Sequence, residues 1–172
     1  APEQKWLPVR VTGSYLPEGE VLVRNRPCSG ASGYDVVTPF LTDRGDVFMV
    51  DRGCVPAGSE ANTAAPYDTA PTGEQTIVAH LRAGEPAVNG RRDTGSTVGS
   101  IELDGLASRV AAPSYTAAYG QLVSPSGAAA PYAFERPDPD EGPHLSYALQ
   151  WYVFALIAAV AYVWAARNER RN

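Results

Sequence analysis

The chain has 172 residues and a net charge of −5 at pH 7. This length allows one ordinary domain with a small appendage, and the acidic balance excludes the basic patch that a nucleic-acid-binding protein needs. Its 16 glycines and 15 prolines follow no period, which favours a domain of strands and turns over collagen or a helical bundle.

Alternation of apolar and polar residues predicts strands in the first third of the chain. Glu20–Asn25 is the first of these predicted strands, and Pro27–Gly33 follows it as a predicted loop. Tyr34–Leu41 and Asp46–Asp51 are expected to pair as a hairpin through a four-residue turn that ends in glycine. Because proline cannot donate to a β ladder, Pro39 predicts an edge strand or a bulge.

The rest of the first 140 residues alternates between loops and short elements. Residues 56–74 and 83–97 lack periodicity and are predicted loops, with the strand Gln75–Leu81 between them. Glu102–Val110 can form a short helix, and Tyr119–Ser124 reads as another strand. These local connections predict an α+β protein whose outer domain is an antiparallel, β-rich sheet or small barrel with one or two short helices.

An uncharged apolar segment, Tyr147–Ala166, follows near the C-terminus. Twenty helical residues rise about 30 Å, which matches the hydrocarbon core of a bilayer. Tyrosine and tryptophan stand near both ends, as at membrane interfaces. The alternative, a buried core helix, rarely runs so long without a charge. We therefore predict a β-rich domain over residues 1–140, a transmembrane helix over 143–167 and a tail over 168–172.

The charges that flank this segment predict its orientation. Arginines stay on the cytoplasmic side of a membrane, and here they follow the segment, whereas acidic residues precede it. The prediction is a plasma-membrane protein with a cytoplasmic C-terminus and residues 1–140 on the extracytoplasmic side. Export also requires an upstream signal, so we expect a further membrane segment before Ala1. The charges concerned are Arg167, Arg170 and Arg171 after the segment and Asp138, Asp140 and Glu141 before it.

Cys28 and Cys54 are the two cysteines of the chain. Outside the cytoplasm such a pair favours a disulfide, which here would clamp the open end of the predicted hairpin. A zinc site is the alternative, but neither cysteine has a histidine or third cysteine nearby. The two histidines, His80 and His144, stand far apart, and no catalytic constellation is visible, so we expect a protein that is not an enzyme.

The C-terminal helix has two unlike faces when it is laid out at about 100° per residue. One face is aliphatic and suits lipid; the other mixes aromatic, polar and small residues and suits a partner protein or a cofactor. At the head of the mixed face, a neutral imidazole can ligate haem iron, with Tyr147 and Trp151 along the porphyrin edge. The alternative is an interfacial histidine that bonds lipid headgroups or the preceding loop. The mixed face consists of His144, Tyr147, Trp151, Ala155, Ala158 and Tyr162, and the aliphatic face of Leu149, Val153, Leu156, Ile157, Val160 and Trp164.

The sequence Pro143–Ala155 closely resembles the second transmembrane motif of the surfeit locus protein 1 family, assembly factors for haem–copper cytochrome c oxidases. Other blocks resemble the family's opening strands and central hairpin, in the same order. The resemblance therefore covers nearly the whole chain. These blocks are Val11–Leu16, Val21–Arg26, Gly33–Pro39 and Val50–Pro56.

Two departures from the family pattern accompany the resemblance. The family normally has an N-terminal transmembrane helix, and this sequence starts where that helix should end, which agrees with the expected upstream segment. Cys54 stands where many relatives have tryptophan, and its pairing with Cys28 resembles a Gram-positive or actinobacterial variant.

The resemblance implies a non-enzymatic accessory factor of the oxidase that acts in haem a delivery or in maturation of the oxidase core. Some family members bind haem a through the histidine at the position of His144. The expected cofactor is thus transiently bound haem a, and the expected partners are oxidase core subunits, a bc1–oxidase supercomplex and the lipid membrane. Two alternatives are a stoichiometric supercomplex subunit without haem and an unrelated single-span receptor.

Overall fold

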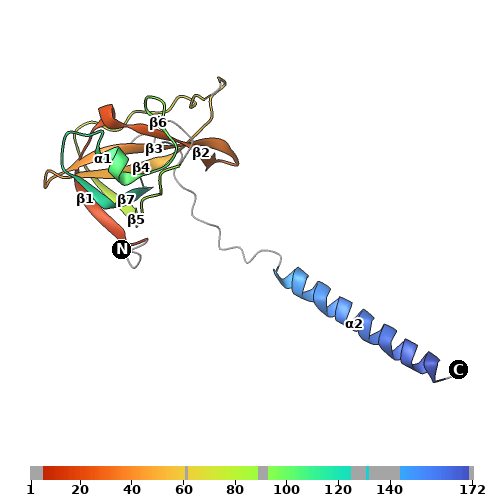
Figure 1. Cartoon of the computed structure of the whole chain (residues 1–172). Coiled ribbons are helices and arrows are strands. Elements are labelled where there is room, and N and C mark those ends of the chain that lie inside the picture. Colours follow the sequence, from red (N-terminus) through yellow and green to blue (C-terminus); the bar gives the residue numbers. More distant parts are fainter. Residues whose placement is uncertain (1–5, 61, 89–92, 125–130, 132–143, 171–172) are drawn as a thin grey trace. The chain divides into compact units, whose positions relative to one another are not determined.

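The computed structural model describes residues 6–60, 62–88, 93–124, 131 and 144–170 (Figure 1). The chain divides into two compact units, Ala1–Glu135 and Arg136–Asn172. In the described residues, the first unit is mostly β-sheet and the second is one long helix. A mostly β domain followed by a C-terminal helix is what the sequence predicts.

The described part of the first unit contains seven strands, a 3₁₀ turn and a short helix. Most predicted elements are present, although β2, β3, β4 and β7 are longer than the alternation indicated. The strands are β1 (Pro8–Tyr15), β2 (Val21–Cys28), β3 (Ala31–Thr42), β4 (Val47–Pro56), β5 (Glu74–Arg82), β6 (Thr97–Val98) and β7 (Ser114–Ser124); the helices are η2 (Pro17–Gly19), α1 (Leu103–Ala107) and α2 (His144–Glu169).

The strands form one sheet in the order β1-β5-β7-β4-β3-β2-β6, and β1 also pairs with β3. Strands β1, β5, β7, β4 and β3 therefore close into a ring, which makes a small barrel. Five of the pairings are antiparallel, but β4–β7 and β2–β6 are parallel. The prediction of an antiparallel sheet is wrong at these two places. Parallel neighbours need a long crossover connection, and alternation within a strand carries no information about it.

Alternation along the strands builds two large apolar cores and a smaller one around Tyr34, Val36 and Val55. On β4, Phe48 and Val50 point into the barrel, whereas Val47 and Met49 point to its other side. The barrel core draws residues from all five strands of the ring, and the second core lies between the sheet and α1. The barrel core includes Tyr15, Phe40, Phe48, Val50, Ile77 and Leu122, and the second core includes Val23, Val37, Val47, Met49, Leu103 and Leu106.

The predicted loop Pro27–Gly33 is wrong, because β2 and β3 meet in a tight hairpin. The two-residue turn consists of Ser29 (φ 48°) and Gly30 (φ 79°). Two consecutive positive φ angles match the twist of a hairpin, so the strands continue almost to the turn.

The prediction that Pro39 marks an edge or a bulge is also wrong. The bulge in the β3–β4 ladder lies between Asp35 and Val37, and Pro39 pairs with Met49. Pro39 stands where β3 exchanges β2 for β1 as its neighbour on the other side. The Leu16 N–H donates to the Pro39 carbonyl at 2.8 Å. The edge of Pro39 that carries its carbonyl and its nitrogen therefore faces the place where β2 ends and β1 begins to pair with β3. A missing donor is tolerated there because neither neighbour needs it.

Cys28 and Cys54 form a disulfide with a Cα–Cα distance of 5.6 Å, as predicted. Both residues are buried, and the bond joins β2 to β4 across the intervening β3. It lies at the end of the β3–β4 hairpin that is opposite its turn. The bond therefore ties three neighbouring strands together where the hairpin would otherwise open.

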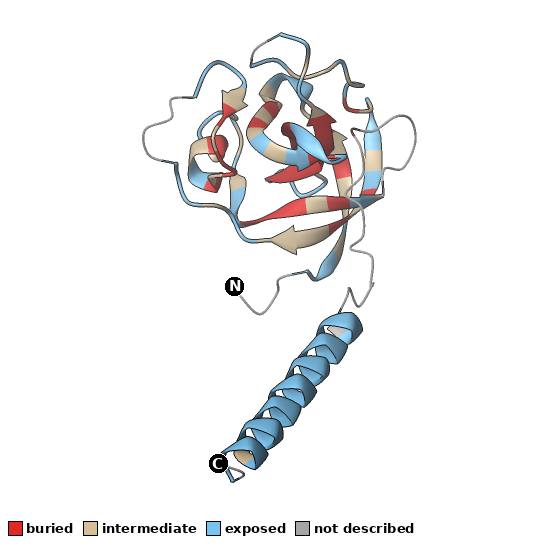
Figure 2. Cartoon of the chain, turned by 90° about the vertical axis from the view of Figure 1, so that its right-hand side faces the viewer, coloured by how far each residue is buried: buried red, intermediate tan, exposed pale blue. Residues whose placement is uncertain are grey.

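Helix α2 has 26 residues, and those whose exposure the structure describes are exposed, except Ala166, which is intermediate (Figure 2). Its segment Leu145–Glu169 is long and apolar enough to cross a membrane.

Candidate functional site

The predicted site residues of the helix all lie on α2. His144 is its first residue, and the structure describes only its backbone. Tyr147, Trp151 and Tyr162 are 60%, 70% and 76% exposed, and Ala155 and Ala158 are exposed as well. The Trp151 ring packs edge-on against Phe154, with centroids 6.0 Å apart.

The aliphatic face of α2 is as exposed as the mixed face, with Leu149 at 66% and Val160 at 62%. The described contacts therefore bring no second element to either face. Haem ligation by His144 and partner contact through the mixed face stay predictions.

The β unit contains a buried charge cluster that sequence patterns did not reveal. Arg26 on β2, Asp35 on β3 and Asp51 on β4 point to the same side of neighbouring strands, where Glu85 reaches them from the segment after β5. Arg26 Nη2 donates to Glu85 Oε2 at 2.5 Å, and its Nε lies 3.1 Å from Asp35 Oδ2. The Nε contact is an ion pair without a hydrogen bond, so this buried N–H has no acceptor among the described residues.

Three carboxylates thus share one guanidinium in this cluster. Burial raises the pKa of Asp35 to about 6, although Arg26 opposes the shift. Burial, reinforced by the negative charge of Asp35, raises the pKa of Asp51 well above its usual range. Asp51 is 1% exposed, and its Oδ1 accepts the Gly53 N–H at 3.2 Å. Burial also opposes ionisation of Glu85, but hydrogen bonds from Arg26 and the Ile101 N–H outweigh it and lower its pKa.

A second charged network lies around Glu20 and Arg52, two residues next to or inside the family-like blocks. Glu20 Oε2 accepts from Arg52 Nη1 at 3.0 Å and from the Thr38 hydroxyl at 2.6 Å, and Oε1 accepts from Tyr67 at 2.9 Å. Arg52 is 3% exposed and also donates to the Asp68 carbonyl at 3.2 Å. The network fastens the loop after β4 to the barrel.

Both networks connect strands of the β unit to loops that are distant in sequence. Among the described residues, no group of three histidine, cysteine or acidic side chains is placed to hold a metal ion. One sign of these networks was present in the sequence, since Asp35 interrupts the apolar run of the predicted strand Tyr34–Leu41, whereas Asp51 and Arg52 stand at and just after the end of the predicted strand Asp46–Asp51. The sequence did not show which charges meet, because Arg26 and Glu85 are 59 residues apart.

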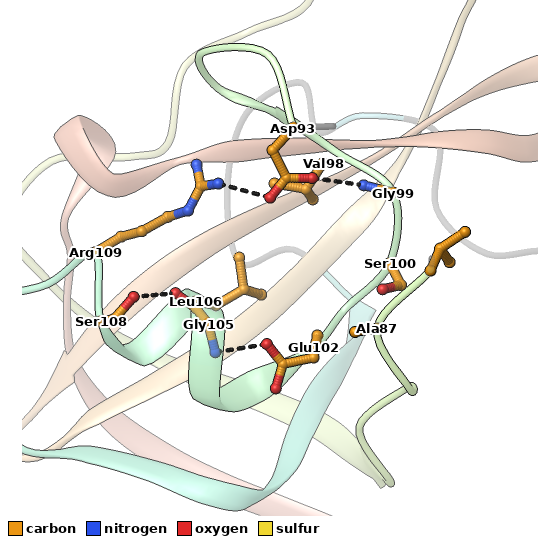
Figure 3. Close-up of a pocket in the computed structure, with 11 residues that line it drawn as sticks. Ala87, Asp93, Val98, Gly99, Ser100, Glu102, Gly105, Leu106, Ser108 and Arg109 are labelled. Carbon is orange, nitrogen blue, oxygen red and sulfur yellow. Dashed lines mark hydrogen bonds and ion pairs between the residues drawn. The ribbon is translucent and has the colours of Figure 1, made fainter. Parts of the chain in front are cut away.

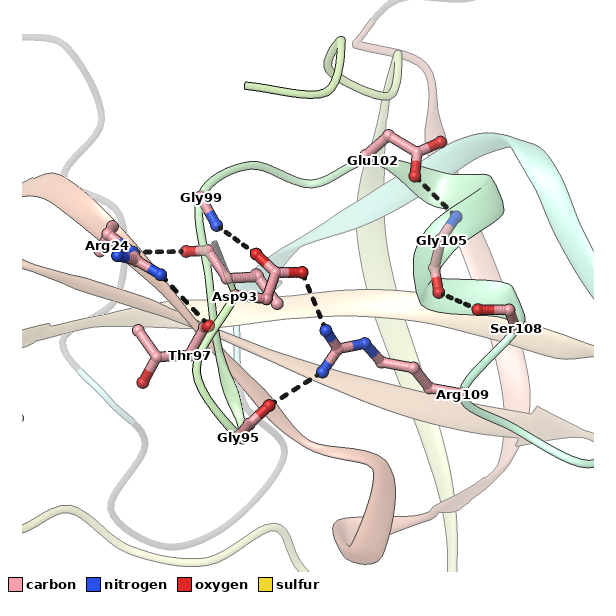
Figure 4. Close-up of polar contacts among 10 residues, drawn as sticks. Arg24, Asp93, Gly95, Thr97, Gly99, Glu102, Gly105, Ser108 and Arg109 are labelled. Atoms are coloured by element: carbon pink, nitrogen blue, oxygen red, sulfur yellow. Dashed lines mark hydrogen bonds and ion pairs between the residues drawn. The ribbon is translucent and has the colours of Figure 1, made fainter. Parts of the chain in front are cut away.

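A surface pocket of about 610 Å³ lies beside α1 (Figure 3). Its charged side chains are engaged within the pocket itself. Arg109 pairs with Asp93 at 2.9 Å, and the Asp93 carboxylate also accepts the Gly99 N–H at 3.3 Å (Figure 4). Glu102 caps the N-terminus of α1 by accepting from the Gly105 N–H at 2.7 Å. These contacts hold α1 and the segment before it together.

Comparison with known proteins finds a match to the model of the SURF1 family over residues 1–156. An uncharacterized SURF1-like protein of Mycobacterium bovis and two from strains of Mycobacterium tuberculosis are 35% identical over 177 residues. The alignment covers 99% of this chain and 64% of each relative, so the chain spans somewhat less than two thirds of their length. The match confirms the resemblance that the sequence motifs indicated.

Proposed function

The chain belongs to the SURF1 family, and from this premise we propose that it is a non-enzymatic accessory protein of haem–copper cytochrome c oxidase. The proposed role is haem a delivery or maturation of the oxidase core. The observation that carries it is the extent of the family match, which runs without interruption from the β unit into α2, past His144.

In this proposal α2 anchors the protein in the plasma membrane, with the β unit on the extracytoplasmic side and the C-terminus in the cytoplasm. The arginines that follow the apolar segment support this orientation. The disulfide supports it as well, because disulfides persist in oxidising compartments and are rare in the cytosol.

The residues at the start of α2 fit a transient haem site. His144 would offer one imidazole as an axial ligand, and Tyr147 and Trp151, both exposed on the same helix face, would pack along the ring. Haem a would bring an iron centre that accepts such a ligand. A delivery factor must also release its cargo, so a single ligand on an exposed helix suits the role better than an enclosed pocket does.

The experiment is an optical spectrum of the detergent-purified protein from cells that synthesise haem a. We expect a bound-haem band that His144→Ala abolishes or shifts to the blue, while His80→Ala leaves it unchanged. His80 is the matched control because it lies on β5 of the β unit. Loss of the band in His80→Ala but not in His144→Ala would contradict the assignment.

The second candidate is a stoichiometric subunit of a respiratory supercomplex that carries no haem. The exposed small residues Ala155 and Ala158 favour it, because small residues let membrane helices pack closely and permanently. Copurification with the oxidase at a fixed ratio, without a haem band from this protein, would select this candidate over the first.

A further inference from the structure

Strands β1 and β5 present an outward face that none of the three described cores uses. The register places Arg10 opposite Val78 and Pro8 opposite His80. The hydroxyl groups of Thr12 and Thr76 form a hydrogen bond of 3.0 Å, which shows that the even-numbered residues of both strands share this face. The odd-numbered residues of the same strands, such as Val11 and Ile77, pack in the barrel core.

Trp6 lies on the end of this face. Its ring centroid is 6.1 Å from that of His80, and the Arg82 guanidinium lies over it at 4.0 Å. The backbone N–H of Trp6 donates to the Leu81 carbonyl at 2.9 Å. Trp6 nevertheless remains 52% exposed, and its φ of 70° is uncommon for a bulky residue. The Trp6 backbone is thus in the left-handed region, while its half-exposed ring contacts His80 and Arg82.

We call Trp6, Pro8, Arg10, Val78, His80 and Arg82 the Trp6 face. Arg10 and Arg82 form no salt bridge with any described residue. The acidic residue of β5, Glu74, lies at the far end of the strand, opposite Ser14. Arg82 has an acidic neighbour in Glu85, whose pKa it helps to lower, but that carboxylate is already paired with Arg26. The end that carries Trp6 therefore keeps an excess of positive charge beside aromatic and partly apolar residues, although the whole chain is acidic.

This composition fits the interface of a lipid bilayer. An indole, with its apolar body and one N–H donor, favours the headgroup level of a membrane. Arginine binds phosphate oxygens in paired hydrogen bonds, and cationic side chains are drawn to anionic leaflets. The hydrophobic contribution to membrane binding is small because the exposed apolar area of the face is modest. The charges must therefore supply the selectivity for anionic lipid.

The chain also tethers the sheet that carries the Trp6 face to α2. Strand β7 ends at Ser124, which pairs with Val78 of this face. The chain then continues through residues 125–143 to α2, which is able to cross a bilayer. Even fully extended, such a connection reaches roughly 65 Å, so an inserted α2 keeps the face at a high local concentration near the lipid.

We propose that the Trp6 face binds the surface of a bilayer that contains anionic lipid, with Trp6 at headgroup level and Arg10 and Arg82 on lipid phosphates. The proposal rests on the proposed insertion of α2. It gives the β unit a fixed side toward the membrane, which leaves its opposite side for other partners.

The test reconstitutes the full chain into vesicles of phosphatidylcholine, with and without phosphatidylglycerol, in which the acyl chains are brominated close to the headgroup. The variant Trp151→Phe plus Trp164→Phe leaves Trp6 as the only tryptophan, and Trp6→Phe leaves the two tryptophans of α2. We expect bromine to quench Trp6 fluorescence when phosphatidylglycerol is present and much less when it is absent. The α2 tryptophans should be quenched in both lipid mixtures.

Adding Arg10→Gln and Arg82→Gln to the Trp6-only variant should reduce its quenching in phosphatidylglycerol vesicles to the level in phosphatidylcholine. Ser59→Glu plus Thr72→Glu lowers the net charge equally at exposed loop positions and should leave the quenching unchanged. Unquenched Trp6 beside quenched α2 tryptophans would overturn this proposal and leave the membrane anchor intact. Unquenched α2 tryptophans would overturn the anchor itself.

Discussion

At the scale of single residues, the buried carboxylates decide how stability depends on pH. The folded state raises the pKa of Asp35 to about 6 from an ordinary value of 3.8, chiefly through burial. Between these two values the folded chain holds a proton that the unfolded chain releases, so stability falls as the pH rises through this window. At pH 7 the cost of burying the charge is fully present.

We therefore expect acidification from pH 7 to pH 5 to raise the free energy of unfolding by about 1.4 kcal/mol, which is the part of the effect of this shift that falls within the range. Asp35→Asn should flatten the dependence, as measured by urea unfolding of the full chain in detergent. Glu85→Gln is the control of opposite sign, because the lowered pKa of Glu85 makes its ionised form stabilising at pH 7. Stability that rises with pH in this range would contradict the prediction.

Arg52 and Glu20 form the other buried pair. Removing one partner of such a pair leaves an uncompensated buried charge, so Arg52→Met should cost about 3–5 kcal/mol. Adding Glu20→Gln should recover part of the loss, and a double-mutant cycle by chemical denaturation measures it. The exposed pair of Arg109 and Asp93 is the control, where Arg109→Met should cost only about 0–1 kcal/mol. Equal losses at the two arginines would show that burial is not the deciding factor.

At the scale of elements, α2 has two faces that the structure leaves equally exposed. Membrane helices associate by close packing of small residues, so the mixed face should be the one that contacts the oxidase. Ala155→Leu plus Ala158→Leu should weaken copurification with the oxidase, whereas Leu156→Ala plus Val160→Ala should not. Equal effects of the two double variants would mean that the faces are assigned wrongly.

At the scale of the whole molecule, the proposed topology makes a direct prediction. A reporter fused after Asn172 that is active only in the cytoplasm should be active, because Arg167, Arg170 and Arg171 follow the apolar segment. A reporter that works only outside the cytoplasm should be silent at the same position. Activity of the second reporter would reverse the orientation and remove the oxidising environment assumed for the β unit.

The sequence by itself determined the features that depend on neighbouring residues or on composition. These are most of the strands, the apolar helix, the family and, because the chain has two cysteines, the pairing of Cys28 with Cys54. Alternation reports which residues of a strand are buried, and the length of an uncharged run reports whether it can span a bilayer.

Only the tertiary structure decided what depends on residues far apart in the chain. The closure of the barrel needs β1 to meet β3, and the parallel pairing of β4 with β7 crosses the whole segment that contains β5 and α1. The charge cluster joins Arg26 to Glu85, and the Trp6 face joins the start of the chain to β5. Contacts of this kind depend on how the strands are ordered in space, which local patterns do not encode.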